Sequence, residues 1–376
     1  MRFVVAFWMA LCCTQISFAA TIYVPDDFTT IQDAIDNANN HGDIVVIRDG
    51  TYSGEGNRNI DFRGKAITVK SENGPKNCVI LNTTQDLYSC FLFSNAEFDE
   101  SILEGLTIEG FYFGIQASSS PIINNCIIQW CHNGFLFANY SQIAINNCVV
   151  LYNETAFMNG SAREVKVTNC TVTRNTFVFD NQNAKLVNCI IWNNTNTDTV
   201  DQSYASYCDL QYVEPTGTNI SADPMFVGSG DYYHLTSSSP CIDKGSATDF
   251  SPVDIDGTSR PKCARPDIGA TEFICSDPVA DAGTDQVVST KVTFDGSGSH
   301  SYTTQIVSYH WDIISRSSAA LNKTAEGMSP TVSGLANGYY DVTLTVTDDH
   351  GMSDADQMVL SATGFTDKRV VVIPLN

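Results

Sequence analysis

Short apolar runs recur at a regular spacing along the middle of the chain, and each begins at a cysteine. The clear copies begin at Cys126, Cys148, Cys170 and Cys189, with a weaker copy at Cys208, so that the steps are 22, 22, 19 and 19 residues. Self-similarity at a fixed period of this length predicts a solenoid in which each repeat forms one turn, here called a rung.

Within each copy the pattern has a period of two, which places Cys126 and Ile128, for example, on the same side of a strand. A second apolar stretch follows in each repeat, as at 134–138, and a third precedes the next cysteine, as at 143–145. Three short strands per repeat, without helical periodicity, predict a parallel β-helix rather than a leucine-rich repeat.

An asparagine column accompanies the cysteines. Cys131, Asn153, Asn175 and Asn194 each stand five residues after a cysteine of the repeat. Stacked asparagine side chains hydrogen-bond from rung to rung at the spacing of adjacent strands, so we expect them to form a ladder.

The cysteines of the repeat are predicted to be buried thiols that act as small apolar core residues. Disulfides within the column are the alternative, and the chain lacks the C-x-x-C and H-E-x-x-H spacings of zinc sites. Outside the repeat, Cys241, Cys263 and Cys275 lie in turn-rich sequence, and we expect two of them to form a disulfide.

The segment before the repeat predicts a short amphipathic helix that covers the open end of the first coil. Thr30 and Asp33 can cap it, and Ile31, Ala34 and Ile35 share one apolar face. The stretches 21–36 and 42–52 resemble the start of right-handed parallel β-helix proteins of the pectin-lyase-like superfamily. The motifs Ala222-Asp-Pro-Met-Phe and Asp267-Ile-Gly-Ala-Thr-Glu resemble the closing segment of secreted bacterial β-helix proteins. The resemblance covers about residues 21–274 and implies architecture rather than chemistry.

The pattern changes at Asp277, where the rung signature ends. Alternating strands such as 341–346, separated by Gly, Ser and Asp turns, predict a β-sandwich. This segment resembles the polycystic-kidney-disease (PKD) domain, an immunoglobulin-like module, with Trp311 as the expected core aromatic residue. In that family the module is an accessory or spacer unit, so we assign it no catalysis.

The amino terminus has the layout of a secretory signal peptide, with Arg2, an apolar stretch at 3–11 and small residues up to Ala20. We therefore predict a signal peptide at 1–20, a β-helix domain at 21–276, a PKD-like sandwich at 277–364 and a tail at 365–376. The protein is expected to be secreted or displayed at a cell surface, as a monomer.

Charge excludes two classes of partner. The chain has 20 Lys and Arg against 42 Asp and Glu, a formal net charge of -22. Nucleic acid binding needs clustered cations, and an anionic membrane surface repels such a chain. Since no apolar run after residue 20 reaches membrane length, we expect no membrane insertion.

No complete catalytic motif is present. Of the polygalacturonase pattern only Asn196-Thr197-Asp198 occurs, and the methylesterase segments have no counterpart. A polysaccharide lyase needs a Lys or Arg base, or Ca²⁺ to neutralise the substrate carboxylate. Because no Lys or Arg occurs from 77 to 162, the weak catalytic candidates are Lys166 and Arg174. The alternative for Arg174 is an ordinary cation stacked on surface aromatic rings.

Trp130 and Tyr152 occupy equivalent positions of successive repeats, and together with Trp192 they are candidates for stacking on sugar rings. Beside them, the outward positions of the main strands form an apolar stripe that includes Ile127 and Ile190. Such a stripe indicates a ligand or partner surface, or else it is covered by the loop-rich region 195–275.

No cofactor is expected, with Ca²⁺ as the one possibility. Asp254-x-Asp256-Gly could hold Ca²⁺, but the remaining EF-hand ligands are missing, and a capping turn is favoured. The sequence thus favours an extracellular β-helix protein that presents its rungs to polysaccharide or to a surface protein. The alternatives are a polysaccharide lyase or glycoside hydrolase, and a structural adhesin or stalk.

Overall fold

The computed structural model describes residues 19–39, 41–84, 86–95, 101–138, 142–160, 164–180, 184–196, 200–228, 230–275, 277–301 and 305–363. The expected signal peptide up to residue 18, the expected tail, and residues 197 and 198 of the Asn196-Thr197-Asp198 loop lie outside them. The chain forms a parallel β-solenoid of about eight turns and a carboxy-terminal β-sandwich, as the repeat predicts. It divides into two compact units, residues 1–166 with 175–184, and residues 167–174 with 185–376.

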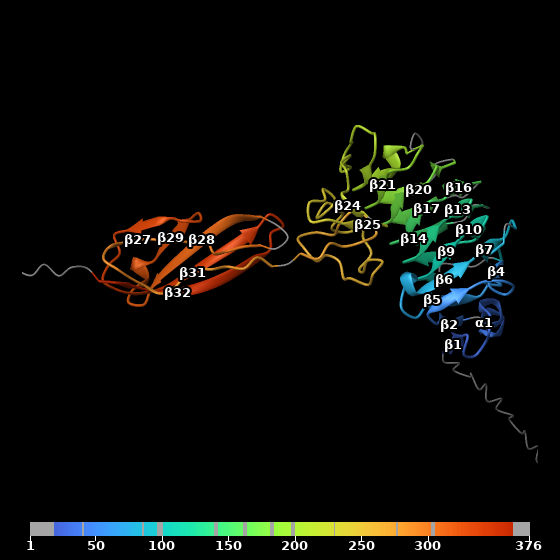
Figure 1. Cartoon of the computed structure of the whole chain (residues 1–376), viewed down its shortest axis with the longest axis horizontal. Helices are drawn as coiled ribbons and strands as arrows, with labels where there is room; N and C mark the ends of the chain where they lie inside the picture. The colour runs from blue at the N-terminus through green and yellow to red at the C-terminus, as the bar shows by residue number, and fades with distance from the viewer. Residues whose placement is uncertain are drawn as a thin grey trace, which may run out of the picture. The chain divides into compact units, whose positions relative to one another are not determined.

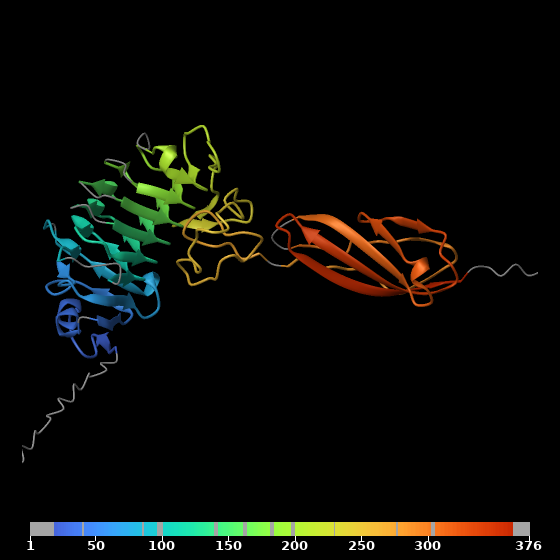
Figure 2. The ribbon, with the colours of Figure 1, turned by 180° about the vertical axis from the view of Figure 1, so that it is seen from behind.

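Each rung contributes up to three short strands, and equivalent strands of successive rungs pair in parallel within each unit. Figure 1 labels many of them, and Figure 2 shows the same ribbon from behind. The first series is β1 (Thr21–Val24), β2 (His41–Ile47), β5 (Ala66–Ser71), β8 (Ile102–Glu104), β11 (Ile122–Asn124), β14 (Gln142–Asn146), β17 (Glu164–Thr168), β20 (Ala184–Val187) and β22 (Ala205–Ser206).

The second series is β3 (Gly50–Tyr52), β6 (Cys78–Leu81), β9 (Thr107–Glu109), β12 (Ile127–Gln129), β15 (Val149–Leu151), β18 (Thr171–Thr173), β21 (Ile190–Trp192) and β23 (Asp209–Leu210). The third series is β4 (Ile60–Asp61), β7 (Ser89–Phe93), β10 (Phe113–Ala117), β13 (Asn133–Phe137), β16 (Thr155–Asn159) and β19 (Phe177–Phe179). The short helices are α1 (Ile31–Asn37), η1 (Pro75–Asn77), η2 (Gln202–Tyr204) and η3 (Ala319–Leu321).

The helix that covers the first coil is confirmed. The Thr30 hydroxyl accepts a hydrogen bond from the backbone N–H of Asp33 at 3.2 Å and donates one to the Asp33 carboxylate at 2.7 Å. Ile31, Ala34 and Ile35 are buried beneath the helix. The cap satisfies one of the helix's free backbone donors, and the apolar face covers the first coil.

Left-handed backbone turns explain why asparagine precedes the cysteines. Gly105, Asn125 and Asn147 have φ of 73°, 54° and 51°, and Asn169 and Asn188 have φ of 51° and 54°. Glycine and asparagine are the residues that adopt this conformation most cheaply. Because the rungs are in register, the Asn147 amide also donates to the Asn125 side chain at 3.1 Å.

The predicted inner asparagine ladder is confirmed as well. The buried amide of Asn153 donates to the Asn175 side chain at 3.0 Å and to the Ile128 carbonyl at 3.0 Å, and its oxygen accepts from the Cys131 backbone at 2.9 Å. Phe135 and Phe157 stack beside it in the core with ring centroids 5.4 Å apart. Identical positions of successive rungs thus fill the core as continuous columns.

The segment after the last rung folds back over the second unit. It includes β24 (Phe226–Gly228) and β25 (Asp231–Leu235), and Leu235, Cys241 and Ile268 pack with Ile190 in one cluster. The apolar stripe is therefore buried: Ile127 is 7% exposed and Ile190 is 0% exposed. Of the two readings of the stripe, the covered one is correct for Ile190.

This closing segment contains a buried ion pair. The Arg260 guanidinium lies 2.9 Å from the Glu272 carboxylate, and both side chains are fully buried. Arg260 also donates to the carbonyl oxygens of Asp267 and Gly269. A buried charge needs this degree of pairing, so the pair fixes the path of the segment.

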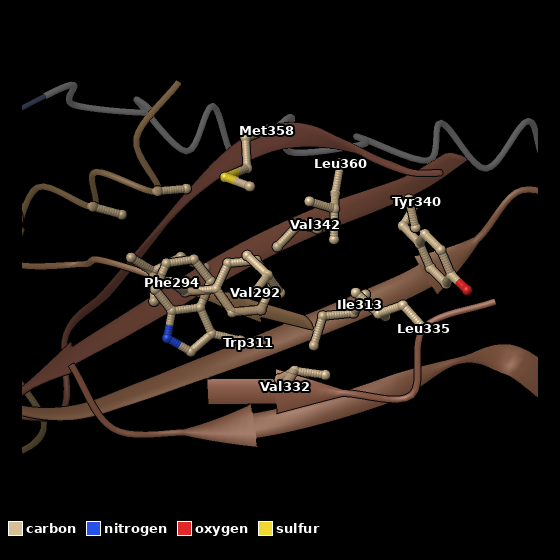
Figure 3. Packing of buried hydrophobic residues seen from close by; sticks show 14 of the residues in the cluster. Val292, Phe294, Trp311, Ile313, Val332, Leu335, Tyr340, Val342, Met358 and Leu360 are labelled. Carbon is tan, nitrogen blue, oxygen red and sulfur yellow. The ribbon is translucent and has the colours of Figure 1, made fainter. Parts of the chain in front are cut away.

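The sandwich has a five-stranded sheet in the order β26-β32-β31-β28-β29 and a two-stranded sheet, β27-β30. Trp311 is fully buried, stacks on Phe294 at 4.7 Å and donates to the Gly327 carbonyl, as expected for the core aromatic residue. Figure 3 shows this core. The strands are β26 (Gln286–Val288), β27 (Lys291–Thr293), β28 (Ile306–Ser315), β29 (Lys323–Glu326), β30 (Thr331–Ser333), β31 (Gly338–Asp348) and β32 (Ser353–Ala362).

Cysteine accessibility gives a first test. Cys263 and Cys275 form a disulfide with a Cα–Cα distance of 5.8 Å, and the nine other cysteines of the described chain, Cys241 included, are buried and free. Burial raises the pKa of Cys131 to about 12, which suppresses its thiolate. In the chain from residue 21 to 376, we expect nine thiols to react with Ellman's reagent after denaturation without reductant, and none before it. Fewer than nine in denaturant would indicate disulfides within the columns.

The closing segment predicts a pH dependence. The buried carboxyl of Asp209 accepts from the Ala222 backbone at 3.1 Å and the Cys241 thiol at 3.2 Å, and burial raises its pKa from 3.8 to about 6. The folded state therefore binds the proton more tightly, and stability falls as pH rises from about 4 to 6, by about 3 kcal/mol. We expect Asp209→Asn to flatten urea-unfolding free energies across this window. The exposed control Asp277→Asn should keep the wild-type slope, and an unchanged slope in both variants would contradict the assignment.

Candidate functional site

A second column of left-handed turns follows the strands of the second series. Its residues are Gly110, Trp130, Tyr152, Arg174, Asn193 and Tyr212, with φ of 80°, 56°, 57°, 59°, 57° and 60°. Glycine and asparagine suit this conformation, whereas a bulky side chain in it is an outlier. An outlier of this kind directs attention to function, because the same backbone accepts cheaper residues in other rungs.

Trp130 and Tyr152 form a flat aromatic stack at this corner. Their rings are 4.3 Å apart and inclined by only 3°, and Trp130 is 56% exposed. Gln129 pairs with Glu109 of the preceding rung, so Gly110 is the residue aligned with Trp130 on that side. Because glycine has no side chain, the face of Trp130 that points away from Tyr152 is left without a stacked neighbour from this column.

A second column lies two residues further along each rung. Tyr112 and His132 stack with centroids 4.5 Å apart, and the His132 Nδ1 lies 2.6 Å from the Glu154 carboxylate. Both side chains of the His132–Glu154 pair are largely exposed. We call Trp130, Tyr152, Tyr112, His132 and Glu154 the corner site.

A small open cavity of about 170 Å³ adjoins this site. Its volume is close to the ~150 Å³ that accommodates one benzene ring in a protein interior. The loop after β6 supplies one wall and the two aromatic columns supply the other. The lining residues are Thr84, Asp86, Leu87, Gly110, Phe111, Tyr112, Trp130 and His132.

The surroundings of the cavity are acidic. From residue 77 to 162 the chain has seven Asp and Glu and no Lys or Arg. Asp86 is exposed at the cavity, and its carboxylate makes no hydrogen bond or ion pair within the part of the chain that the structure describes. Glu109 is occupied by the Gln129 amide at 2.9 Å. The site therefore combines aromatic faces with carboxylates, without a nearby cation from this part of the chain.

The other residues singled out from the sequence lie in different surroundings. Trp192 is half-buried against the closing-segment cluster of the second unit. The exposed Arg174 places its guanidinium carbon 3.7 Å from the centre of the Tyr232 ring, which is the stacked-cation alternative with a different ring. Lys166 is half-buried on β17.

The Asp254 and Asp256 turn has the geometry of a cap. One Asp254 oxygen accepts from the backbone of Asp256 at 2.9 Å and of Thr258 at 2.7 Å, and the other accepts from Glu272 at 2.8 Å. Asp256 contacts His234. Burial, opposed by these carboxylate contacts, leaves the pKa of His234 raised. The proposed Ca²⁺ ligand Asp254 is thus engaged by the backbone.

Among the described residues, the one cluster of three potential metal ligands is Cys263, Cys275 and His350. Its two cysteines are joined in the disulfide, so they offer no thiolates to a metal ion. No helix in the described ranges has both the length and the apolar character needed to span a membrane.

Sequence reasoning missed Tyr112, His132 and Glu154. The signal was present, because each stands two residues after a turn position of the column that holds Trp130 and Tyr152. Aligning the repeats over their whole length, and not only at the cysteines, would have placed these three side chains in one column.

The fold defines an all-β protein in which a parallel β-solenoid precedes a β-sandwich. Residues 282–361 match a family model of the PKD domain, and the sandwich belongs to the PKD domain family. The match covers the sandwich and not the solenoid. No curated protein matches the chain.

Solved structures similar to the chain have low overall superposition scores. The PKD1 domain of Vibrio anguillarum Epp is 27% identical, with 24% of this chain and 98% of that chain covered and a TM-score of 0.21. The PKD1 domain of the Vibrio cholerae metalloprotease PrtV is 34% identical, with 23% and 99% covered and a TM-score of 0.20. A structure of carbohydrate-binding modules from the beta-sandwich superfamily is 26% identical, with 25% and 37% covered and a TM-score of 0.21.

Proposed function

We propose that this chain is an extracellular polysaccharide-binding protein that holds a sugar ring at the corner site without chemically altering it. The observation that carries the proposal is the exposed Trp130 face, held in a left-handed turn beside a cavity of about 170 Å³. The solenoid serves as a rigid frame for this site, and the PKD domain as an accessory or spacer module.

The chemistry of the site suits a carbohydrate. The C–H face of a sugar ring packs on an aromatic ring, and its hydroxyls need hydrogen-bonding groups at the edge. Trp130 and Tyr112 supply aromatic surface, and Thr84 and Asp86 supply polar groups around the same cavity. Stacking on the neighbouring Tyr152 fixes the Trp130 ring, which lowers the entropy lost on binding.

Membership of the solenoid in the pectin-lyase-like superfamily remains part of the proposal, as do export and right-handedness. The resemblance of the opening and closing segments supports them. A surface protein as partner is the alternative ligand, and a purely structural adhesin or stalk is the alternative role. An aromatic residue placed at a backbone cost beside a cavity favours a ligand over a plain structural surface.

One observation favours an enzyme as the second candidate function. The His132 imidazole is held by the Glu154 carboxylate at 2.6 Å, and a histidine oriented in this way can accept a proton from a substrate. This pair, rather than Lys166 or Arg174, is then the place to look for a lyase or hydrolase.

Removing the aromatic face tests binding. For Trp130→Ala we expect at least a tenfold loss of affinity for a polysaccharide bound by the 21–376 chain, about 1.4 kcal/mol, measured by affinity electrophoresis over a panel of neutral, acidic and amino-sugar polymers. The matched control is Tyr212→Ala, since Tyr212 is 82% exposed and has φ of 60° but does not line the cavity. Equal losses in the two variants would contradict the corner site, and no binding to any polymer would favour the stalk.

Product formation tests the enzyme. We expect neither unsaturated uronide absorbing near 235 nm nor new reducing ends from any polymer of the panel, with Ca²⁺ or with chelator. Product that disappears in His132→Gln while binding persists would replace the binding function by catalysis at the same corner. The Lys166→Ala and Arg174→Ala variants serve as comparisons, because a loss confined to them would locate the chemistry elsewhere.

A further inference from the structure

We infer that the corner site selects a polysaccharide whose sugars carry free, positively charged amino groups. This inference rests on the proposed function and specifies its ligand class. It follows from the juxtaposition of an uncovered aromatic face, an unpaired carboxylate at the same cavity, and a stretch of chain without cations.

Asp86 is the first element of the argument. It lines the cavity together with Trp130, is exposed, and has no side-chain partner among the residues that the structure describes. A carboxylate with no internal partner contributes nothing measurable to the fold through pairing, but it is available to a ligand ammonium. A charge-assisted hydrogen bond of this kind is about twice as strong as a neutral one.

The aromatic faces act in the same direction. An ammonium group placed over a tryptophan ring gains about 0.5–2 kcal/mol from the ring quadrupole, and tryptophan is the best side chain for this contact. Trp130 offers one face beside Gly110, and Tyr112 lies on the same cavity wall. A cationic sugar is thus attracted by the aromatic rings and by Asp86 at once.

The charge balance disfavours the opposite class. The 77–162 stretch has seven acidic and no basic residues, and the whole chain has a formal net charge of -22. A uronate polymer brings one negative charge per sugar into this field, where the described cavity lining offers no Lys or Arg to pair with it. Repulsion of like charges at these distances is felt within a Debye length of about 8 Å at physiological salt.

The direct test compares three oligosaccharides of equal length: glucosamine with free amines, N-acetylglucosamine as its neutral counterpart, and galacturonate. Calorimetry on the 21–376 chain, below the pKa of the amine, should give at least tenfold tighter binding of the free amine than of the acetylated form. Galacturonate should not bind. Raising the salt concentration should weaken binding of the amine and leave the acetylated form unchanged.

Two substitutions separate charge from stacking. Asp86→Asn should lower the affinity for the free amine five- to tenfold without changing that for the acetylated form. Trp130→Ala should weaken both. Asp277→Asn, an exposed acid outside the cavity lining, serves as the control with unchanged affinities.

The outcomes distinguish the two levels of the argument. Equal or tighter binding of the acetylated form, lost in Trp130→Ala, would overturn charge selection and leave polysaccharide binding intact. Tighter binding of galacturonate would overturn it as well. Failure of all three sugars and of the wider polysaccharide panel would overturn the proposed function itself.

Discussion

In-register parallel pairing of one rung on the next is the constraint on which the rest of the structure depends. It places equivalent residues about 4.8 Å apart, so a side chain meets copies of itself above and below. Inside the solenoid this yields the phenylalanine stack and the hydrogen-bonded pair Asn153–Asn175. Outside, the same geometry sets Trp130 flat on Tyr152 at 4.3 Å. The core and the candidate site are therefore two consequences of one register.

Much of this could be predicted because columns are visible in the sequence. A repeated cysteine with Ile or Val two residues later determines which side of the strand is buried, and the equivalence of Trp130 and Tyr152 follows from the same alignment. The left-handed turns could also be inferred, since asparagine recurs where φ is positive, as at Asn125 and Asn147.

What the repeat does not encode could not be predicted. The burial of Ile190 depends on where the turn-rich closing segment returns, and that path is fixed by the Arg260–Glu272 pair, two residues far from the repeat. The cavity depends on Gly110 lacking a side chain opposite Trp130 and on a loop after β6 that breaks the periodicity. Both features join residues that no periodic pattern relates, so only the folded chain brings them together.

Energetics distinguish the corner from the core. A non-glycine residue in a left-handed turn costs roughly 1–3 kcal/mol, so Trp130 and Tyr152 together cost about 2–6 kcal/mol. Their stacking returns only about 0.5–1.5 kcal/mol beyond area burial, and Trp130, 56% exposed, buries little of its surface. Asn193 occupies the equivalent turn of another rung at lower cost. Stability alone therefore does not account for the two aromatic residues, whereas a ligand that covers the open Trp130 face would bury the surface that the fold leaves exposed.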